Sequence, residues 1–117
     1  MKSKGPTEFQ ERVYATVRRI PPGKVASYSV VASAVDCRSP RAVGQAMRLC
    51  PYDDVPCHRV VAAGGRLGGF GGQDFGKVLQ RKKQMLLAEG VTFRPGGQID
   101  EEHVLPDSPG VRRLLRG

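Results

Sequence analysis

The sequence predicts one mostly helical α/β domain, a winged-helix-like helix-turn-helix followed by a short strand or hairpin that carries Cys57. Three observations predict it. A chain of 117 residues supplies material for one core. Apolar residues recur at helical spacing in several segments, and one short apolar run starts at Cys57. With 39% hydrophobic and 26% charged residues, the composition is that of an ordinary globular domain.

The first helix is expected over residues 8–19. Thr7 and Gln10 form a capping-box pattern at its start. The proline–proline–glycine run at 21–23 ends it. Its apolar stripe, which would face the core, consists of Phe9, Val13, Val17 and Ile20.

Two short helices are expected next, over residues 29–35 and 40–49. Ser39 is a favoured N-cap, and Pro40 suits the first helical position, where its missing N–H costs nothing. Joined by a tight turn, the two helices form a helix-turn-helix with the second as recognition helix. The pattern alone favours an ordinary helical hairpin over a DNA-binding motif, so the DNA-binding interpretation depends on other residues.

The segment around Cys57 is expected to be less helical. Residues 57–61 have the composition of a short strand, and the two glycines at 64–65 are typical of a hairpin turn. The glycine-rich loop 67–72 is either loose or lies close to a partner.

A last helix is expected over residues 74–89, ended by Gly90. Beyond it the chain is rich in proline, glycine and charge. We therefore expect residues 1–93 to form the catalytic and DNA-binding domain, and residues 94–117 to form a loosely ordered C-terminal tail.

The net charge of +8 is unevenly distributed. Residues 1–52 hold nine basic and three acidic side chains and thus carry +6 of it. A polyanion such as nucleic acid suits this charge, and an evenly solvated surface is the alternative interpretation. Apolar runs are too short for a membrane span, and no signal peptide is evident. We expect a protein of the prokaryotic cytoplasm, or of the nucleus in a eukaryote.

The three cysteines, Cys37, Cys50 and Cys57, are expected to be reduced thiols. An odd number without a signal peptide does not suit a disulfide framework. No CxxC pair is present, and the two histidines lie far apart in the sequence. Neither a metal nor another cofactor is therefore expected.

Cys57, His58 and Glu89 are candidates for chemistry. A neighbouring imidazole can raise the thiolate fraction of a cysteine. Glu89 ends a helix, where the dipole disfavours a carboxylate, so a function would explain it. A Cys–His–Glu relay is conceivable. Spacing alone favours a buried cysteine and an exposed glutamate.

The sequence motifs add a resemblance. The segments RAVGQAMR (41–48), VPCHRVV (55–61) and GGFGG (68–72) stand in this order. They closely resemble the O6-alkylguanine-DNA alkyltransferases over about residues 9–93. The cysteine motif after RAVGxAM is highly specific, unlike the helix-turn-helix pattern by itself.

The resemblance implies binding to double-stranded DNA through the minor groove, with the alkylated guanine flipped into a pocket. Arg41 would fill the gap in the base stack, and Tyr28 would lie near the flipped nucleotide. The DNA-binding residues implied are Tyr28, Arg41, Ala42, Gly44, Gln45 and Arg48. The pocket residues implied are Met47, Val60, Gly68, Phe70 and Gly71.

The resemblance also implies the reaction. Cys57 would attack the alkyl carbon, and His58 would act as its base through a water molecule. Glu89 would orient the histidine, and Tyr28 would help to neutralise the guanine. Because the thioether product is stable, each monomer would react once, without a cofactor.

Four features depart from the family pattern. The family's usual N-terminal domain is expected to be absent. The family's hinge asparagine is replaced near Cys50, and that connection is one residue shorter. The lid has Phe70 and Gly71 where tyrosine and serine are common.

A sister group, the alkyltransferase-like proteins, shares the short architecture. These proteins bind alkylated DNA without repairing it, recruit excision-repair proteins, and replace the reactive cysteine by tryptophan or alanine. The retained Cys57 favours transfer over this alternative. A sequence-specific helix-turn-helix regulator is a third hypothesis, which the cysteine motif disfavours.

Overall fold

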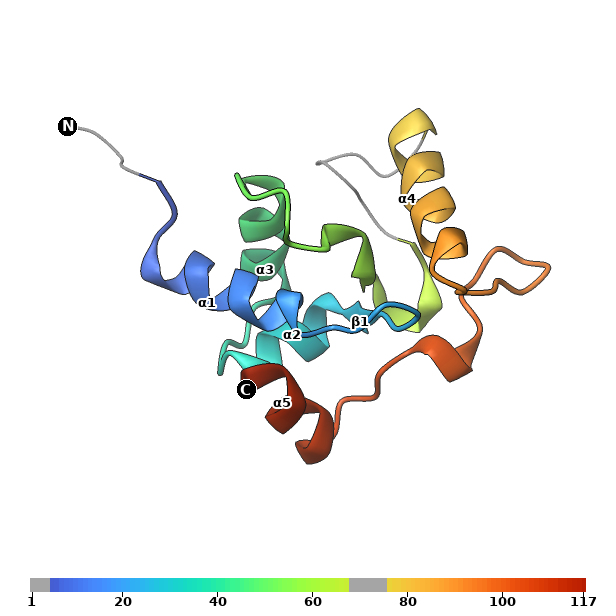
Figure 1. Ribbon diagram of the computed structural model, residues 1–117. Coiled ribbons are helices and arrows are strands. Elements are labelled where there is room, and N and C mark those ends of the chain that lie inside the picture. Colours follow the sequence, from blue (N-terminus) through green and yellow to red (C-terminus); the bar gives the residue numbers. More distant parts are fainter. Residues whose placement is uncertain (1–4, 68–75) are drawn as a thin grey trace.

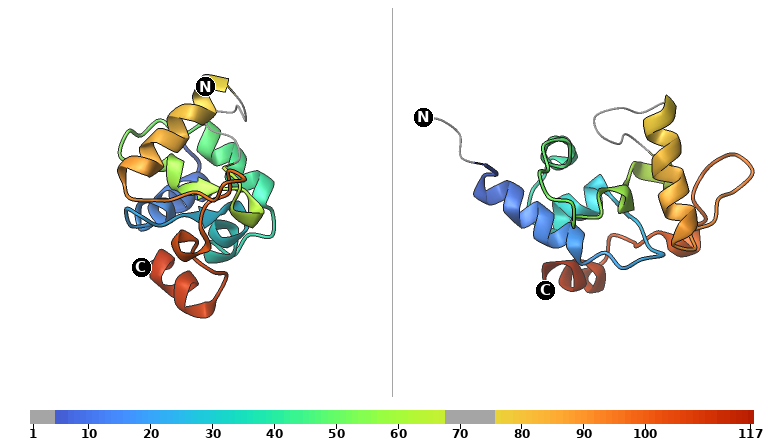
Figure 2. Two further views of the ribbon diagram at one scale, coloured as in Figure 1. Left: turned by 90° about the vertical axis from the view of Figure 1, so that its right-hand side faces the viewer. Right: turned by 45° about the horizontal axis from the view of Figure 1, so that its top comes forward.

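The computed structural model describes residues 5–67 and 76–117. Within these ranges lie five α-helices, a two-stranded sheet and three short 3-10 turns. In chain order the helices and strands are α1 (Glu8–Arg18), β1 (Ala26–Ser27), α2 (Tyr28–Ala34), α3 (Pro40–Arg48), β2 (Val60–Val61), α4 (Gly76–Ala88) and α5 (Pro109–Arg116). Figures 1 and 2 show α4 standing apart from the other helices, with the strands between them.

The helix-turn-helix is formed by α2 and α3, and their caps explain where these helices begin. The Ser27 hydroxyl accepts from the N–H of Val30 at the start of α2, and Ser39 does the same for Ala42 at the start of α3. The predicted capping box of Thr7 and Gln10 is confirmed at the start of α1. These caps set the register in which each helix turns its apolar side inward.

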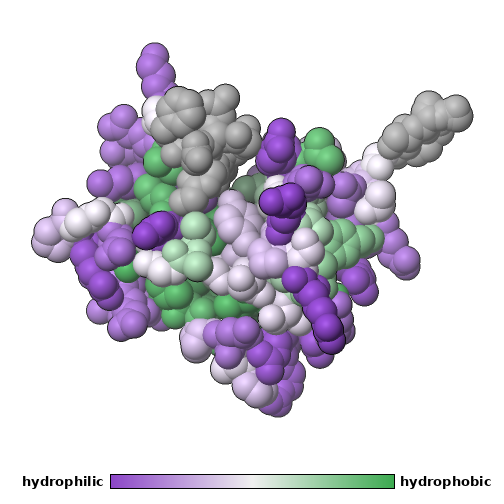
Figure 3. Space-filling view, turned by 180° about the vertical axis from the view of Figure 1, so that it is seen from behind, coloured by the Kyte–Doolittle hydropathy of each residue, from purple (hydrophilic) through white to green (hydrophobic). Residues whose placement is uncertain are grey.

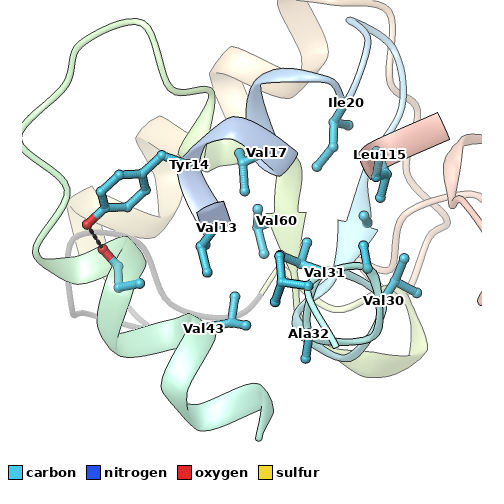
Figure 4. Close-up of a cluster of buried hydrophobic side chains, with 14 of the residues drawn as sticks. Val13, Tyr14, Val17, Ile20, Val30, Val31, Ala32, Val43, Val60 and Leu115 are labelled. Carbon is cyan, nitrogen blue, oxygen red and sulfur yellow. Dashed lines mark hydrogen bonds between the residues drawn. The ribbon is translucent and has the colours of Figure 1, made fainter. Parts of the chain in front are cut away.

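The main core lies between α1, α2, α3 and α5 (Figure 4). Four helices and one strand contribute fully buried aliphatic side chains to this core, among them Val13, Val17, Val31, Val43, Val60 and Leu115. The Tyr14 hydroxyl, buried beside them, donates to the carbonyl of Ala46 over 2.6 Å. This bond joins α1 to α3 and satisfies a polar group that would otherwise be costly to bury.

The sheet pairs β1 with β2 in parallel, with Ala26 opposite Val60 and Ser27 opposite Val61. The predicted hairpin after Cys57 is therefore wrong. The chain does turn at Gly64 and Gly65, both at positive φ, but β2 pairs with a strand from the first half of the chain. This pairing brings the start of α2 next to the segment that precedes β2.

Cys57 itself does not lie on a strand, which corrects a second expectation. Residues Cys57–Arg59 form a 3-10 turn, η1, closed by a 2.9 Å bond from the N–H of Arg59 to the carbonyl of Pro56. The physical reason is visible in Glu89, which binds the side chains of both His58 and Arg59. Neighbouring residues on a strand point to opposite faces and could not share one carboxylate.

The segment after Arg94 is folded, so the expected loose tail is also wrong. Ile99 and Leu115 are 1% and 0% exposed. Val104 forms a parallel bridge with Val25, and α5 begins with Ser108 as N-cap and Pro109 in the first turn. Burial of these few apolar side chains outweighs the polar composition around them. Figure 1 shows this segment crossing beneath the molecule to place α5 beside α1 and α2.

Polar side chains cover much of the surface. Figure 3 shows hydrophilic residues spread over one face, with smaller apolar areas between them. Within the described residues, none of the helices is both long and apolar enough to cross a bilayer.

Candidate active site

Cys57 opens the η1 turn at the end of the loop that leaves α3. Its side chain is half-buried and packs against the main core. Burial, followed by a hydrogen bond and charge repulsion from the neighbouring thiol of Cys50, raises the pKa of Cys57 to about 12. The thiol is therefore neutral at physiological pH, and a reaction at sulfur needs a group that removes its proton.

His58 and Glu89 lie in contact, as the relay requires. Nε2 of His58 is 2.9 Å from Oε2 of Glu89. Because a carboxylate only accepts, this nitrogen carries the hydrogen and Nδ1 is the basic nitrogen when the ring is neutral. His58 is 7% exposed. The contact therefore fixes the tautomer and orientation of a buried imidazole.

Arg59 stabilises the Glu89 carboxylate at the C-terminal end of α4, where the helix dipole is unfavourable for a negative charge. Its Nε donates to Oε1 of Glu89 over 3.0 Å and its Nη2 to Oε2 over 2.6 Å. A third bond, from Nη1 to the carbonyl of Ile20, measures 2.8 Å. Chiefly this Arg59 contact, and then the His58 contact, lowers the pKa of Glu89. The carboxylate therefore remains ionised despite the unfavourable helix dipole.

Gly90 shapes the position of Glu89. Gly90 has a φ of 93°, and the N–H of Val91 donates to the carbonyl of Leu86. The chain thus leaves α4 through a Schellman motif, the helix end that Gly90 predicted. The motif satisfies the last carbonyls of the helix and leaves Glu89 at the C-cap facing η1.

Lys82 is a site residue that the sequence analysis missed. It is fully buried in the middle of α4, and its Nζ donates to the carbonyl of Val60 over 2.8 Å and to that of Leu67. Burial lowers the pKa of Lys82 to about 8, and Cys57 acts in the opposite direction. Its position seven residues before Glu89, two turns along the same helix face, was the available signal.

Tyr28 lies where β1 passes into α2. Its ring is half-buried, and a Cβ added to Gly44 would come within 4.0 Å of Cε1 of Tyr28. Burial, with a smaller contribution from Cys57, raises the pKa of the Tyr28 phenol. The hydroxyl therefore stays protonated at neutral pH and can act as a hydrogen-bond donor near the sulfur.

The recognition helix α3 turns three polar side chains to solvent, Arg41, Gln45 and Arg48. Its half-buried positions are Ala42, Gly44 and Met47. Of the expected pocket residues, Met47 packs against the main core and Val60 is buried within it. Gly68, Phe70 and Gly71 lie outside the described residues, as does the expected start of the last helix at residue 74.

No metal site accompanies the thiols in the part of the chain that the structure describes. There, no group of three or more histidine, cysteine, aspartate or glutamate side chains is placed to hold an ion. Cys37, Cys50 and Cys57 are all free.

The fold and the site define a class of protein: a helix-turn-helix domain with a half-buried cysteine next in sequence to a histidine that a glutamate orients. A family model described as "6-O-methylguanine DNA methyltransferase, DNA binding domain" matches residues 8–91. The chain belongs to this family. The resemblance inferred from the sequence motifs is thereby confirmed.

Relatives carry two kinds of name. A methylated-DNA–protein-cysteine methyltransferase of Sulfolobus acidocaldarius is 43% identical over 86 residues, which cover 73% of this chain and 51% of the relative. A DNA base-flipping protein of Escherichia coli is 42% identical over 94 residues, covering 79% and 69%. The chain spans about half the length of the methyltransferases it matches.

The fold has a counterpart among solved structures. The crystal structure of S. pombe Atl1 in complex with damaged DNA containing O6-carboxymethylguanine has a TM-score of 0.69 and 33% sequence identity. The likeness covers 91% of this chain and 99% of that chain. It confirms the predicted mostly helical domain with a helix-turn-helix.

Proposed function

We propose that this protein repairs O6-alkylguanine in duplex DNA by transferring the alkyl group to Cys57. The observation that carries the proposal is the pairing of His58 with Glu89 at 2.9 Å, directly beside Cys57 in the η1 turn. A purely structural cysteine has no need of an oriented, buried imidazole. The methyltransferase names of several relatives support the same reaction.

DNA would be bound through α3. Its exposed Arg41, Gln45 and Arg48 suit phosphates and base edges, and the basic first half of the chain adds sequence-independent affinity. Arg41 would enter the stack in place of the flipped base. The partner is therefore double-stranded DNA containing O6-alkylguanine, bound by one copy of the chain.

The transfer forms one bond and breaks one. Sγ of Cys57 attacks the alkyl carbon, and the bond from that carbon to O6 of guanine breaks. His58 takes the thiol proton through a water molecule, and the buried positive charge of Lys82 favours the thiolate. The Tyr28 hydroxyl donates a hydrogen bond to the guanine as negative charge develops on it, and the released guanine takes up one proton from solvent. The product is an S-alkylcysteine and an unmodified guanine.

The second candidate is a sensor that binds the lesion without transfer and recruits excision-repair proteins. Two observations favour it. The pKa of Cys57 is raised to about 12, so the resting thiol is a weak nucleophile. In addition, the likeness to Atl1 covers nearly all of both chains.

Intact mass spectrometry distinguishes the two candidates. The protein is incubated with a duplex containing O6-methylguanine, and the Cys57→Ala variant serves as the control. We expect the wild-type mass to rise by one methylene unit and the variant mass to stay constant while its lesion binding is retained. An unchanged wild-type mass together with preferential lesion binding would instead establish the sensor.

Gly44→Ala tests the placement of DNA on α3. An added Cβ meets only ordinary contact with Tyr28, so the fold tolerates it, and the helix gains up to about 1 kcal/mol of stability. The same methyl group would hold the backbone of α3 away from the groove. We expect an unchanged or higher Tm and about tenfold weaker duplex binding, the equivalent of about 1.4 kcal/mol. Unchanged affinity in a fluorescence-anisotropy titration would place the DNA elsewhere.

A further inference from the structure

The loop from α3 to Cys57 is fastened to α1 at two points. The Tyr52 hydroxyl donates to Oε2 of Glu11 over 2.7 Å. Arg18 donates twice to Asp54, from Nε to Oδ2 over 2.9 Å and from Nη2 to Oδ1 over 3.1 Å. Glu11 and Arg18 are seven residues apart and so lie on one face of the helix. Both ends of this face therefore hold the same loop.

The two fastenings are joined through the Tyr52 ring. The Arg18 guanidinium carbon lies 5.1 Å from the ring centre, within range of a cation–π interaction. The Tyr52 ring also packs edge-to-face against the Tyr14 ring, with the two ring centroids 5.6 Å apart and the ring planes at 84°. Tyr14 in turn donates to the carbonyl of Ala46 on α3. The network thus ties the loop to α1 and, through Tyr14, to the last turns of the recognition helix.

The loop is short, so its position fixes that of the thiol. Asp54 precedes Cys57 by three residues, and Pro56 between them limits the backbone. The N–H of Cys57 donates to the carbonyl of Val55 over 2.8 Å, which carries the constraint to the cysteine itself.

We propose that Arg18, Glu11, Tyr52 and Asp54 form a latch that positions the thiol of Cys57 for alkyl transfer. Arg18 and Tyr52 are then positioning residues, which act on the reaction through the loop. The inference rests on the proposed transfer function, and it adds that α1 controls the reacting cysteine.

Loss of the latch should affect the transfer rate and the stability of the protein to very different extents. The side chains of Arg18 and Asp54 are 35% and 69% exposed, so solvent screens their ion pair and it adds little to stability. A displacement of about 1 Å at a reacting atom can nevertheless cost about 100-fold in rate. Loss of the latch should therefore slow transfer far more than it lowers Tm or weakens DNA binding.

Arg18→Met tests this pattern, because methionine keeps an unbranched apolar chain and removes the charge. Arg112→Met is the matched control, since it breaks a comparable arginine–aspartate pair, with Asp107, on α5. We expect Arg18→Met to lower the transfer rate on saturating lesion duplex about tenfold, with Kd and Tm close to wild type. Arg18→Lys should recover part of the rate, and Arg112→Met should match wild type. A wild-type rate in Arg18→Met would overturn the latch.

A second readout does not depend on transfer. Iodoacetamide alkylation of each cysteine is followed by peptide mass mapping in the free protein. We expect Cys57 to react faster in Arg18→Met and in Tyr52→Leu than in wild type, while Cys37 reacts at the same rate. Equal Cys57 rates in all three proteins would refute the latch. If the wild-type protein does not accept methyl groups but Cys57 reacts faster with iodoacetamide in the two variants, the proposed function fails and the latch stands.

Discussion

Replacing Glu89 by alanine is expected to lower the free energy of unfolding by about 3 kcal/mol, the lower end for breaking a buried ion pair. The side chains of His58, Arg59 and Glu89 are only 9–19% exposed, and alanine leaves three N–H donors of His58 and Arg59 without their acceptor. The transfer rate should fall about 100-fold, since His58 loses the group that orients it. Urea denaturation and single-turnover kinetics measure the two effects.

The pH dependence of the same variant gives an independent check. The Arg59 contact lowers the pKa of Glu89 in the folded protein. The stability that the Glu89 carboxylate adds is therefore fully present above the ordinary pKa of about 4.3. That contribution is lost as the pH falls through the lower folded value. The stability difference between wild type and Glu89→Ala should therefore stay constant from pH 7 down to about pH 4.3 and shrink below that value. Asp107→Ala, which breaks an exposed pair, should cost less than about 1 kcal/mol. Equal losses in both variants would contradict a buried role for Glu89.

Replacing Lys82 by methionine is expected to slow transfer about tenfold. The buried ammonium is the charge that favours the Cys57 thiolate, and each unit of thiol pKa changes the thiolate population tenfold, equivalent to about 1.4 kcal/mol. Lys83→Met is the matched control. Lys83 is the next residue of α4, and its Nζ lies 5.2 Å from the ring centre of Phe93 instead. Equal transfer rates in the two variants would remove Lys82 from the reaction.

The lowered pKa of Lys82 also makes the free energy of unfolding depend on pH. Its folded pKa is about 8 and its ordinary value about 10.4. Between these values the unfolded chain binds more protons, so stability rises with pH, by up to about 3 kcal/mol. The raised pKa of Cys57 acts in the opposite direction but is present in both proteins. The stability of wild type relative to Lys82→Met should therefore increase from about pH 8 to about pH 10. A constant difference would show that the amine is not buried as described.

Local signals in the sequence predicted the helices well because each signal is a backbone requirement. Ser39 and Pro40 predicted the start of α3, and Gly90 predicted the Schellman end of α4. The same Ser–Pro signal at Ser108 and Pro109 predicts α5, but the proline, glycine and charge around it obscured the helix. Composition describes a segment on average, whereas one buried Leu115 suffices to dock it.

Long-range contacts could not be predicted in the same way. Glu89 could be predicted as a candidate because it breaks a local rule at a helix end, and the structure places it against His58. Lys82 was missed because a lysine in a run of basic residues is ordinarily solvated, and its spacing from Glu89 is a weak signal by comparison. Its burial, the parallel pairing of β1 with β2, and the latch between Arg18 and Asp54 depend on how distant segments meet.

The most direct test of alkyl transfer to Cys57 measures the DNA product. A duplex containing O6-methylguanine is incubated in excess with the protein, and its nucleosides are then separated and quantified. We predict that one guanine is restored per protein molecule, that the reaction then stops, and that Cys57→Ala restores none. Tight binding with every O6-methylguanine left intact would contradict transfer and would make the chain a lesion sensor.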